Sequence, residues 1–485
     1  MLTLAKTLSV AAFFLSFSLP ATAQIIPDTT LGGESSKITS TPEVLQIEGG
    51  AIRGTNLFHS FSSFSLNTGE RAHFQNSPNI ENIITRVTGG NISQIDGTIS
   101  ANNTANLFLI NPNGIIFGAN AKLDIGGSFL GTTASEIKFA DNTTYSTINP
   151  QTPPLLTVTA PIGLQLGTNP GNIEVMGTGN NLIYGDNYST IRDNRPAGLE
   201  VNPGNTLILV GGNINLTGGN LTAEGGRIEL AAISSNNTVT ISPDADGWQL
   251  DTTTANQLQD IQLTAAASLD ASGAKGGDIH IMGNSLSMID GSTILANTLG
   301  SETGGGINIR TQDFILLTDN NSSSYPSSLL TEINIGATGD GAPLNLDTGK
   351  LLLLNGAVIS SGTFGAGNGG SVNIRAREYV EMRGTDKTIG LPSFLLSQAN
   401  ETSTGNAGTI NIETGKLLLE DGGLISSSTT SNGNGGNIIV QASELVSVVG
   451  VVPLLNDSSA LSTEAQNGAT GASGTLTGIA PPVQV

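Results

Sequence analysis

The chain has 485 residues, a formal net charge of −21 and no cysteine. With only 18 Lys and Arg residues it lacks the basic surface that nucleic-acid binding requires, and the lack of cysteine excludes a disulfide scaffold and any thiolate site. Glycine, at 63 residues, is about twice as frequent as on average and only 12% of the chain is charged, a composition typical of many short strands joined by tight turns.

The first 23 residues have the three parts of a secretory signal peptide. Lys6 precedes an apolar run over residues 8–19, Pro20 ends the run, and Ala21-Thr22-Ala23 forms a small-x-small cleavage site. The run is shorter than the ~20 residues that span a bilayer. We therefore predict that residues 1–23 are removed during export through the periplasm, which leaves a mature chain of net charge −22. No later segment reaches transmembrane length, so an integral membrane protein is not expected.

Residues 53–64 concentrate aromatic side chains. Phe58, Phe61 and Phe64 recur at every third residue, a spacing that fits one face of a short helix or 3₁₀ turn packed on a sheet. His59 lies among them without an acidic residue or a second histidine at metal-ligand spacing. We therefore interpret His59 as a packing residue and not as a catalyst.

Two apolar runs of strand length, Leu107–Ile110 and Ile115–Phe117, flank the segment Asn111-Pro112-Asn113-Gly114. Pro112 has the φ value that the second position of a β-turn requires, Asn113 can adopt the conformation of the third position, and Gly114 suits the fourth position, from which the next strand begins. On these residues alone, the segment is a buried strand-turn-strand unit.

Several motifs in order between residues 53 and 134 resemble the filamentous haemagglutinin N-terminal domain, the secretion domain of two-partner secretion exoproteins, in its cyanobacterial form. The matching segments are Asn56–Phe61, Ile84–Gly90, Ser93–Gly97, Leu109–Gly118 and Gly126–Phe129.

The resemblance implies an all-β fold, a right-handed parallel β-helix recognised by an outer-membrane β-barrel transporter with periplasmic docking domains. It also implies that Asn111, Pro112, Asn113 and Gly114 form a motif needed for secretion. Other branches of the family carry a second motif upstream, for which this chain has only the imperfect counterpart Asn76-Ser77-Pro78-Asn79. Asn76, Pro78 and Asn79 are therefore a secondary candidate for transporter contact.

The middle of the chain is less regular. Glycine pairs at 211–212, 218–219 and 225–226 predict short strands between close turns. Trp248, the only tryptophan, lies in a segment over 243–251 that we interpret as a surface loop. We place the end of the secretion-type domain near Leu250, which gives one domain over 24–250 and a passenger region over 251–485.

From Gly276 onward the chain repeats. Apolar-x-apolar strands align with steps of 28, 37, 28, 38 and 28 residues, and Asn fills the middle position in four of six units. The aligned residues are Ile279, Ile307, Leu344, Val372, Ile410 and Ile438. Units of about 28 and 37 residues predict a solenoid, a single elongated rod with short extra-helical strands, in which stacked Asn side chains hydrogen-bond to one another and loops absorb the longer steps.

Catalytic motifs are lacking in the sequence. Gly365-x-Gly367-x-x-Gly370 matches a dinucleotide fingerprint, but a strand pattern follows it where a helix is required. Asp278, Asp290 and Asp347 leave one alternative open, a β-helical polysaccharide lyase or hydrolase, although no paired-acid motif is present. We expect no enzymatic activity, cofactor or metal ion. The resemblance instead implies a secreted, cell-surface adhesin or haemagglutinin-like protein whose candidate partner is a carbohydrate or another surface receptor.

Overall fold

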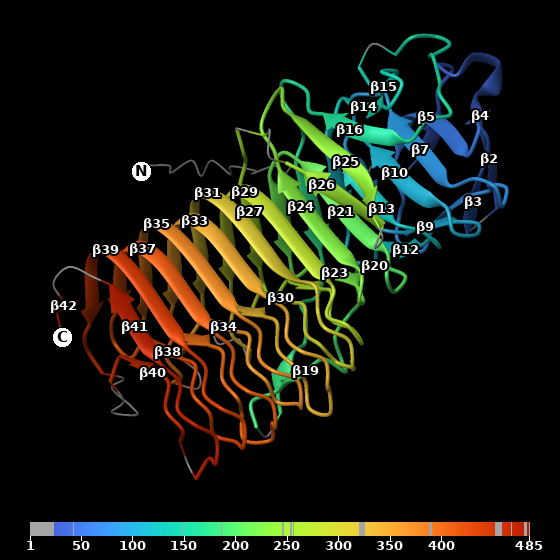
Figure 1. The fold of residues 1–485 in the computed structure, drawn as a ribbon. Coiled ribbons are helices and arrows are strands. Elements are labelled where there is room, and N and C mark those ends of the chain that lie inside the picture. The colour runs from blue at the N-terminus through green and yellow to red at the C-terminus, as the bar shows by residue number, and fades with distance from the viewer. Residues whose placement is uncertain are drawn as a thin grey trace, which may run out of the picture.

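The computed structural model describes residues 24–41, 43–148, 150–185, 187–244, 247–252, 255, 257–319, 325–387, 390–451, 458–466, 468–479 and 483–484. The predicted signal peptide, residues 1–23, lies outside the described residues. The chain forms a parallel β-helix, an elongated stack of coils that runs from the N-terminal part at one end to the C-terminal strands at the other (Figure 1). The predicted fold class is therefore confirmed.

Each coil has three faces, on which strands of successive coils pair in parallel. The first face contains β5 (Asn56–Phe64), β7 (Asn82–Val87), β10 (Asn106–Ile110), β13 (Phe129–Thr132), β21 (Thr206–Gly211) and β24 (Arg227–Ala232). The second contains β8 (Ser93–Ile95), β11 (Ile115–Phe117), β17 (Ile173–Met176), β22 (Ile214–Thr217) and β27 (Ile261–Thr264). The third begins with β6 (Arg71–Phe74), β9 (Thr98–Ala101) and β12 (Lys122–Asp124).

The third face continues as a sheet of short strands along the rest of the rod. These strands are β20 (Leu199–Val201), β23 (Asn220–Ala223), β28 (Ser268–Asp270), β30 (Thr293–Leu295), β32 (Ser328–Leu330), β34 (Val358–Ser360), β36 (Phe394–Leu396), β38 (Leu424–Ser426) and β40 (Ala460–Ser462).

From residue 278 onward, one long strand per coil supplies both the first and the second face. The first half of β29 pairs with β24 and its second half with β27. The long strands are β29 (Asp278–Ile289), β31 (Gly306–Thr318), β33 (Leu344–Leu354), β35 (Val372–Arg383), β37 (Ile410–Leu419) and β39 (Ile438–Val448). The short strands β41 (Leu476–Ile479) and β42 (Val483–Gln484) pair with β39.

The register between the long strands is the one predicted from the sequence. Each of the six aligned residues pairs with the next, from Ile279 with Ile307 to Ile410 with Ile438. The predicted side-chain ladder is also present, because Asn345, Asn373 and Asn411 each donate a hydrogen bond to the Asn of the preceding coil at 2.7–2.8 Å. In the longer steps, β31 ends at Thr318 and β32 begins only at Ser328, and β35 ends at Arg383 and β36 begins only at Phe394, so most of the added length separates the second face from the third.

Alternation along each strand explains the core. Side chains point alternately to the two sides of a sheet, and the apolar cluster inside the coils is mostly Ile, Leu, Val and Phe, with Ala and Met in smaller numbers. Within the described ranges, no helix reaches the length and hydropathy that crossing a membrane requires.

The N-terminal end carries additional strands. β1 (Ile25–Pro27) and β4 (Ala51–Arg53) pair antiparallel with β5, β2 (Ser36–Ser40) and β3 (Val44–Gly49) form a hairpin beside β6, and η1 (Gly32–Glu34) is a 3₁₀ turn. An antiparallel sheet covers the outside of the first face. It consists of β14 (Glu136–Phe139), β15 (Thr144–Ser146), β16 (Pro161–Gln165), β25 (Thr238–Asp244) and β26 (Gly247–Asp251).

This covering sheet corrects two predictions. Trp248 is not in a surface loop, because it lies in β26, is 7% exposed, and packs edge-on against Phe108 with ring centroids 5.5 Å apart. Residues 56–64 form strand β5 and not a helical turn. Phe61 and Phe64 point into the coil, whereas Phe58 packs under the covering sheet, so the three-residue spacing arose from burial on both sides of one strand.

A second segment outside the coils packs against the third face. Residues 180–195, here called the strap, contain the two-stranded hairpin β18 (Ile183–Tyr184) and β19 (Thr190–Ile191). Leu182 belongs to one buried cluster with Leu295, Leu330 and Val358, which lie on three successive later coils. Arg192 binds the fully buried Asp270 with Nε 2.9 Å from Oδ2, so the strap joins the N-terminal region to coils far along the chain.

Candidate functional site

The segment 111–114, here called the corner turn, connects β10 on the first face to β11 on the second. It is a β-turn, because the Gly114 N–H donates to the Asn111 carbonyl at 3.2 Å. Gly114 has φ +130°, a value that favours glycine, and a Cβ there would approach the Asn172 carbonyl to 3.1 Å. The strand-turn-strand structure predicted for this segment is confirmed.

Asn111 is a fully buried residue of the corner turn. Its amide nitrogen donates to the Asn91 carbonyl and to Ser93 Oγ, both at 2.9 Å, so it binds the same corner of the preceding coil. Its Oδ1 accepts hydrogen bonds from the backbone and side-chain nitrogens of Asn113 at 3.1 and 3.0 Å. Asn111 therefore fixes both the shape of the turn and the stacking of two coils.

Asn113 is only half-buried, and so is Pro112. The Asn113 amide nitrogen also donates to the Gly89 carbonyl at 2.7 Å. On the other side, Gly171 of the next coil donates to the Pro112 carbonyl at 2.9 Å. The corner turn is thus held between an earlier and a later coil, and its accessible part consists of Pro112 and the Asn113 side chain.

The secondary candidate lies at a different corner. Asn76, Pro78 and Asn79 belong to the turn between β6 and β7, where the third face meets the first, whereas the corner turn follows the first face. Asn76 is buried and exchanges hydrogen bonds with Asn102 at 2.9–3.2 Å, while Pro78 and Asn79 are exposed. The structure does not bring the two candidate motifs together, because the length of a first-face strand separates them.

A buried charged network, which the sequence did not reveal, lies inside the matching motif 84–90. Arg86 is 1% exposed and donates to Ser60 Oγ at 2.9 Å and to Thr30 Oγ1 at 2.8 Å. Both hydroxyls in turn donate to Asp28, at 2.7 and 2.6 Å, so two hydroxyl groups bridge the guanidinium and the carboxylate.

Opposing effects set the pKa of Asp28. Burial raises it, but the hydrogen bonds from Thr30, Thr88 and Ser60 outweigh burial, and the pKa lies below its ordinary value. Burial also lowers the pKa of Arg86, whose guanidinium lies 4.1 Å from the ring centroid of Tyr145 in β15. The network therefore joins the N-terminal segment, the first coils and the covering sheet. The only sequence signal for it was an arginine in an otherwise uncharged strand.

His59 is part of the aromatic core. Its ring packs against Phe61 and Phe74 with centroids 6.1 and 5.3 Å away, and its Nδ1 lies 3.0 Å from Ser36 Oγ. Burial lowers the pKa of His59 to about 3, so the ring is neutral at physiological pH. His59 is a packing residue, as predicted.

The three carboxylates of the enzymatic alternative do not form a pair. Asp278 begins β29 and lies 3.4 Å from the Arg227 guanidinium, while Asp290 follows the other end of the same strand. Asp347 lies two strands away and four residues further along, on the order of 15 Å from Asp278, and is bound to Arg377 at 2.7 Å. Among the described residues, no three His, Asp or Glu side chains come together as a metal site would require.

The chain was compared with protein families and with solved structures. The family model of the TPS secretion domain matches residues 23–281. A crystal structure of the HMW1 secretion domain from Haemophilus influenzae superposes with a TM-score of 0.58 at 16% identity, covering 93% of this chain and 100% of that one. A filamentous hemagglutinin secretion domain gives a TM-score of 0.33 at 14% identity, covering 81% and 99%. No curated protein matches the chain significantly.

Proposed function

The chain belongs to the TPS secretion domain family of two-partner secretion exoproteins, and we propose that its corner turn is the secretion determinant read by an outer-membrane β-barrel transporter with periplasmic docking domains. The observation that carries this proposal is the division of roles in the turn. Asn111 is buried and holds the coils together, whereas Pro112 and Asn113 remain accessible at the surface. Pro78 and Asn79, exposed at the other end of the first face, form a secondary contact in this proposal.

The test is a secretion assay in a host that expresses the transporter. Asn113→Ala removes the accessible amide and its two hydrogen bonds, to the Gly89 carbonyl and to Asn111 Oδ1, at a stability loss of about 2 kcal/mol, so the domain stays folded. We expect the secreted amount to fall to a minor fraction of the wild-type amount, with Asn79→Ala giving a smaller decrease. Quantitative immunoblots of medium and periplasm measure both.

The matched control is Asn434→Ala, an exposed corner asparagine of the repeat coils whose Oδ1 accepts one backbone hydrogen bond at 2.9 Å. This control should be secreted like the wild type. Normal export of Asn113→Ala would mean that the corner turn has a structural role only.

The coils after the TPS-matching residues are, in this proposal, an adhesive module at the cell surface. The regular stacking of the coils supports this adhesive role. The enzymatic alternative is less well supported, because Asp278, Asp290 and Asp347 do not form a carboxylate pair. Attachment of cells that export the full chain, compared with cells that lack it, tests this role. Release of reducing ends or unsaturated sugars from polysaccharides, abolished by Asp278→Asn or Asp347→Asn, would instead establish the enzymatic alternative.

A further inference from the structure

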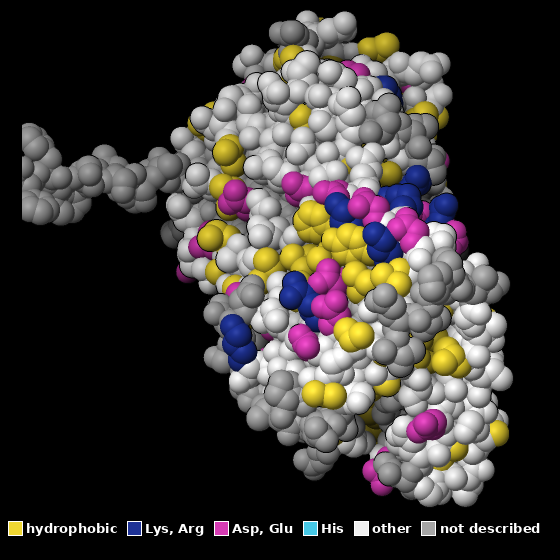
Figure 2. Space-filling view, turned by 90° about the vertical axis from the view of Figure 1, so that its left-hand side faces the viewer, with side chains coloured by type: hydrophobic (Ala, Val, Ile, Leu, Met, Phe, Trp, Pro, Cys, Tyr) yellow, Lys and Arg dark blue, Asp and Glu magenta, His cyan; other side chains and the backbone are white. Residues whose placement is uncertain are grey.

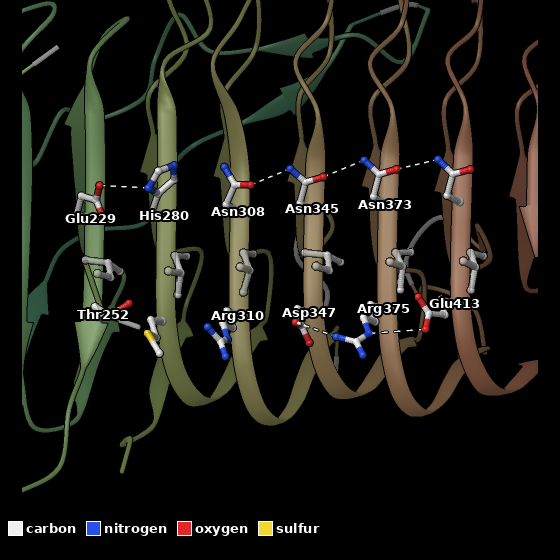
Figure 3. Close-up of a pocket in the computed structure, with 18 of the residues that line it drawn as sticks. Glu229, Thr252, His280, Asn308, Arg310, Asn345, Asp347, Asn373, Arg375 and Glu413 are labelled. Carbon is white, nitrogen blue, oxygen red and sulfur yellow. Dashed lines mark hydrogen bonds and ion pairs between the residues drawn. The ribbon is translucent and has the colours of Figure 1, made fainter. Parts of the chain in front are cut away.

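A groove of 740 Å³ runs along the rod on the outside of the long strands. Two rows of side chains border it (Figure 3). One row is the amide ladder Asn308, Asn345, Asn373 and Asn411, and the other consists of Arg310, Asp347, Arg375 and Glu413. The rows occupy positions two residues apart on each strand, so they stand about 7 Å from each other.

The floor of the groove has no free backbone groups for a ligand. The strands β31, β33, β35 and β37 are each paired with a strand on both sides, so their N–H and C=O groups are used within the sheet. Leu346 and its equivalents, which lie between the two rows, point into the coil and are at most 3% exposed. An additional strand cannot pair here, so a ligand can bind only to side chains, chiefly those of the two rows.

The amide row retains unused hydrogen-bonding capacity. Asn345 and Asn411 each donate one N–H to the preceding coil, and within the described part of the chain the second N–H of each has no partner. The last oxygen of the ladder, Asn411 Oδ1, likewise accepts no hydrogen bond from a described residue. A primary amide offers a donor and an acceptor side by side, which suits hydroxyl groups.

The charged row is neutral overall. Arginine and carboxylate alternate from Arg310 to Glu413, and Arg375 lies 3.9 Å from Asp347 and 3.7 Å from Glu413. Figure 2 shows the same mixing on one face of the molecule, where Lys, Arg, Asp and Glu side chains gather beside hydrophobic ones in one band. Such a row creates no field of a single sign, so it selects against polyanions and polycations.

The groove has one closed end. Leu250 of β26 and Thr252, from the covering-sheet side, border it beside Glu229 and His280, whereas the other end reaches Gln441 of β39. Six strands from β29 to β39 make a length of roughly 24 Å. The space is therefore long, narrow and open at one end, the shape of a site for a linear chain.

We propose that this groove binds a linear, uncharged glycan, with its hydroxyl groups bonded to the amide row and to the charged row. No Phe, Tyr or Trp is among the described residues that line the groove, so each sugar contributes little and affinity grows with chain length as successive units engage. This inference rests on the proposed adhesive function and names the class of receptor for it.

The test uses the full secreted chain and hexasaccharides of β-1,4-linked glucose, mannose and xylose, with the corresponding disaccharides and polygalacturonate for comparison. Asn345→Val/Asn373→Val removes two amides and places strand-favouring residues on the outer face, so folding is retained. We expect at least one hexasaccharide to bind more tightly than its disaccharide, and the double variant to raise its Kd by roughly tenfold or more. Asn406→Ala, in a corner ladder outside the groove, should bind like the wild type.

Equal binding of the hexasaccharide by the wild type and the double variant would overturn the groove assignment, and so would a lack of binding to all three hexasaccharides. Stronger binding of polygalacturonate would overturn the inference of an uncharged ligand. Cell attachment is measured separately with the same variants. Attachment that persists in the double variant defeats the groove but not the adhesive function, whereas no attachment by the wild type defeats the adhesive function itself.

Discussion

The first coils, up to β13, and the coils from β29 onward share the same three faces, but different side chains hold them together. Phenylalanine fills much of the interior of the first coils, at Phe61, Phe64, Phe74, Phe117 and Phe129. From β29 onward, the apolar side chains of the central cluster are aliphatic apart from Met288 and Met382, and asparagine ladders run along the outside of the coils.

The two regions also differ in how they use charge. The N-terminal region buries Arg86 and links it through two hydroxyl groups to the half-buried Asp28, in one network that contacts three layers. On the outer face of their long strands, the repeat coils carry charges in exposed ion pairs such as Arg375 with Glu413, whereas their buried carboxyl groups, Asp319 and Glu332, lie beside the strap. Stability in the repeat coils is therefore a sum of similar neighbour contacts, whereas in the first coils the Arg86 network links three layers at one point.

The largest effect that this comparison predicts is for Arg86→Met. The substitution keeps the apolar stem but leaves Asp28 and the bridging hydroxyls without their cation, which should lower the free energy of unfolding by about 3–5 kcal/mol. Guanidinium chloride unfolding followed by the fluorescence of Trp248, which packs in the same region, measures this loss.

The matching variant in the repeat coils is Arg375→Met, whose side chain is 59% exposed. It should change stability by less than about 1 kcal/mol, as measured by far-UV circular dichroism. Equal losses in the two variants would contradict the distinction between the regions.

An intermediate effect is expected at the strap, where the two regions meet. Burial raises the pKa of Glu332 to about 7 although Ser360 and Thr190 donate hydrogen bonds to it. Because the folded pKa lies above the unfolded value, its stabilising contribution is complete below about pH 4.5 and is lost as the pH rises to about 7. Strap docking should therefore be weaker at pH 8 than at pH 5, by on the order of 2 kcal/mol.

Hydrogen exchange at the hairpin β18–β19 as a function of pH measures this change. Glu332→Gln, which keeps the size of the side chain and cannot ionise, should remove the pH dependence. A hairpin equally protected at both pH values in the wild type would show that Glu332 does not control docking.

The smallest effect is expected for one rung of the amide ladder. Asn373→Val removes the hydrogen bonds to Asn345 and from Asn411 but adds a residue that favours strands, so stability should change by less than about 1 kcal/mol. Denaturant unfolding followed by circular dichroism measures it. A loss of stability as large as that of Arg86→Met would show that the ladder is a main source of stability. It would contradict the proposed difference between the first coils and the repeat coils.

The sequence predicted the repeat coils better than the N-terminal region for a physical reason. In the repeat coils one pattern, apolar inward and polar outward, recurs with each coil, so the spacing of Ile279, Ile307 and Leu344 was enough to place them in register. The corner turn was also predictable, because Pro112 and Gly114 have strong local preferences.

The failures lie where a second layer covers the coil. Phe58 and Trp248 were misplaced because the covering sheet buries the outward side of strands that would otherwise be exposed, and no local pattern encodes that contact. The Arg86 network was missed because its partners come from segments up to 60 residues away. The roles of the corner turn in secretion and of Asn76, Pro78 and Asn79 stay predictions.

The strap also sets a limit on the length of the rod. Its seat, the set of later residues packed with it, contains Leu295, Tyr325, Leu330, Val358 and the partly buried Phe394 of β36, so it is complete only when the coil of β36 is in place. One coil inserted or deleted between residues 226 and 290 would displace that seat by about 4.8 Å along the axis and detach the hairpin. Coils added or removed after β36 leave the seat unchanged. The number of coils is therefore fixed near the N-terminal region and free to vary beyond it, so length can evolve at one end of this protein without disturbing the other.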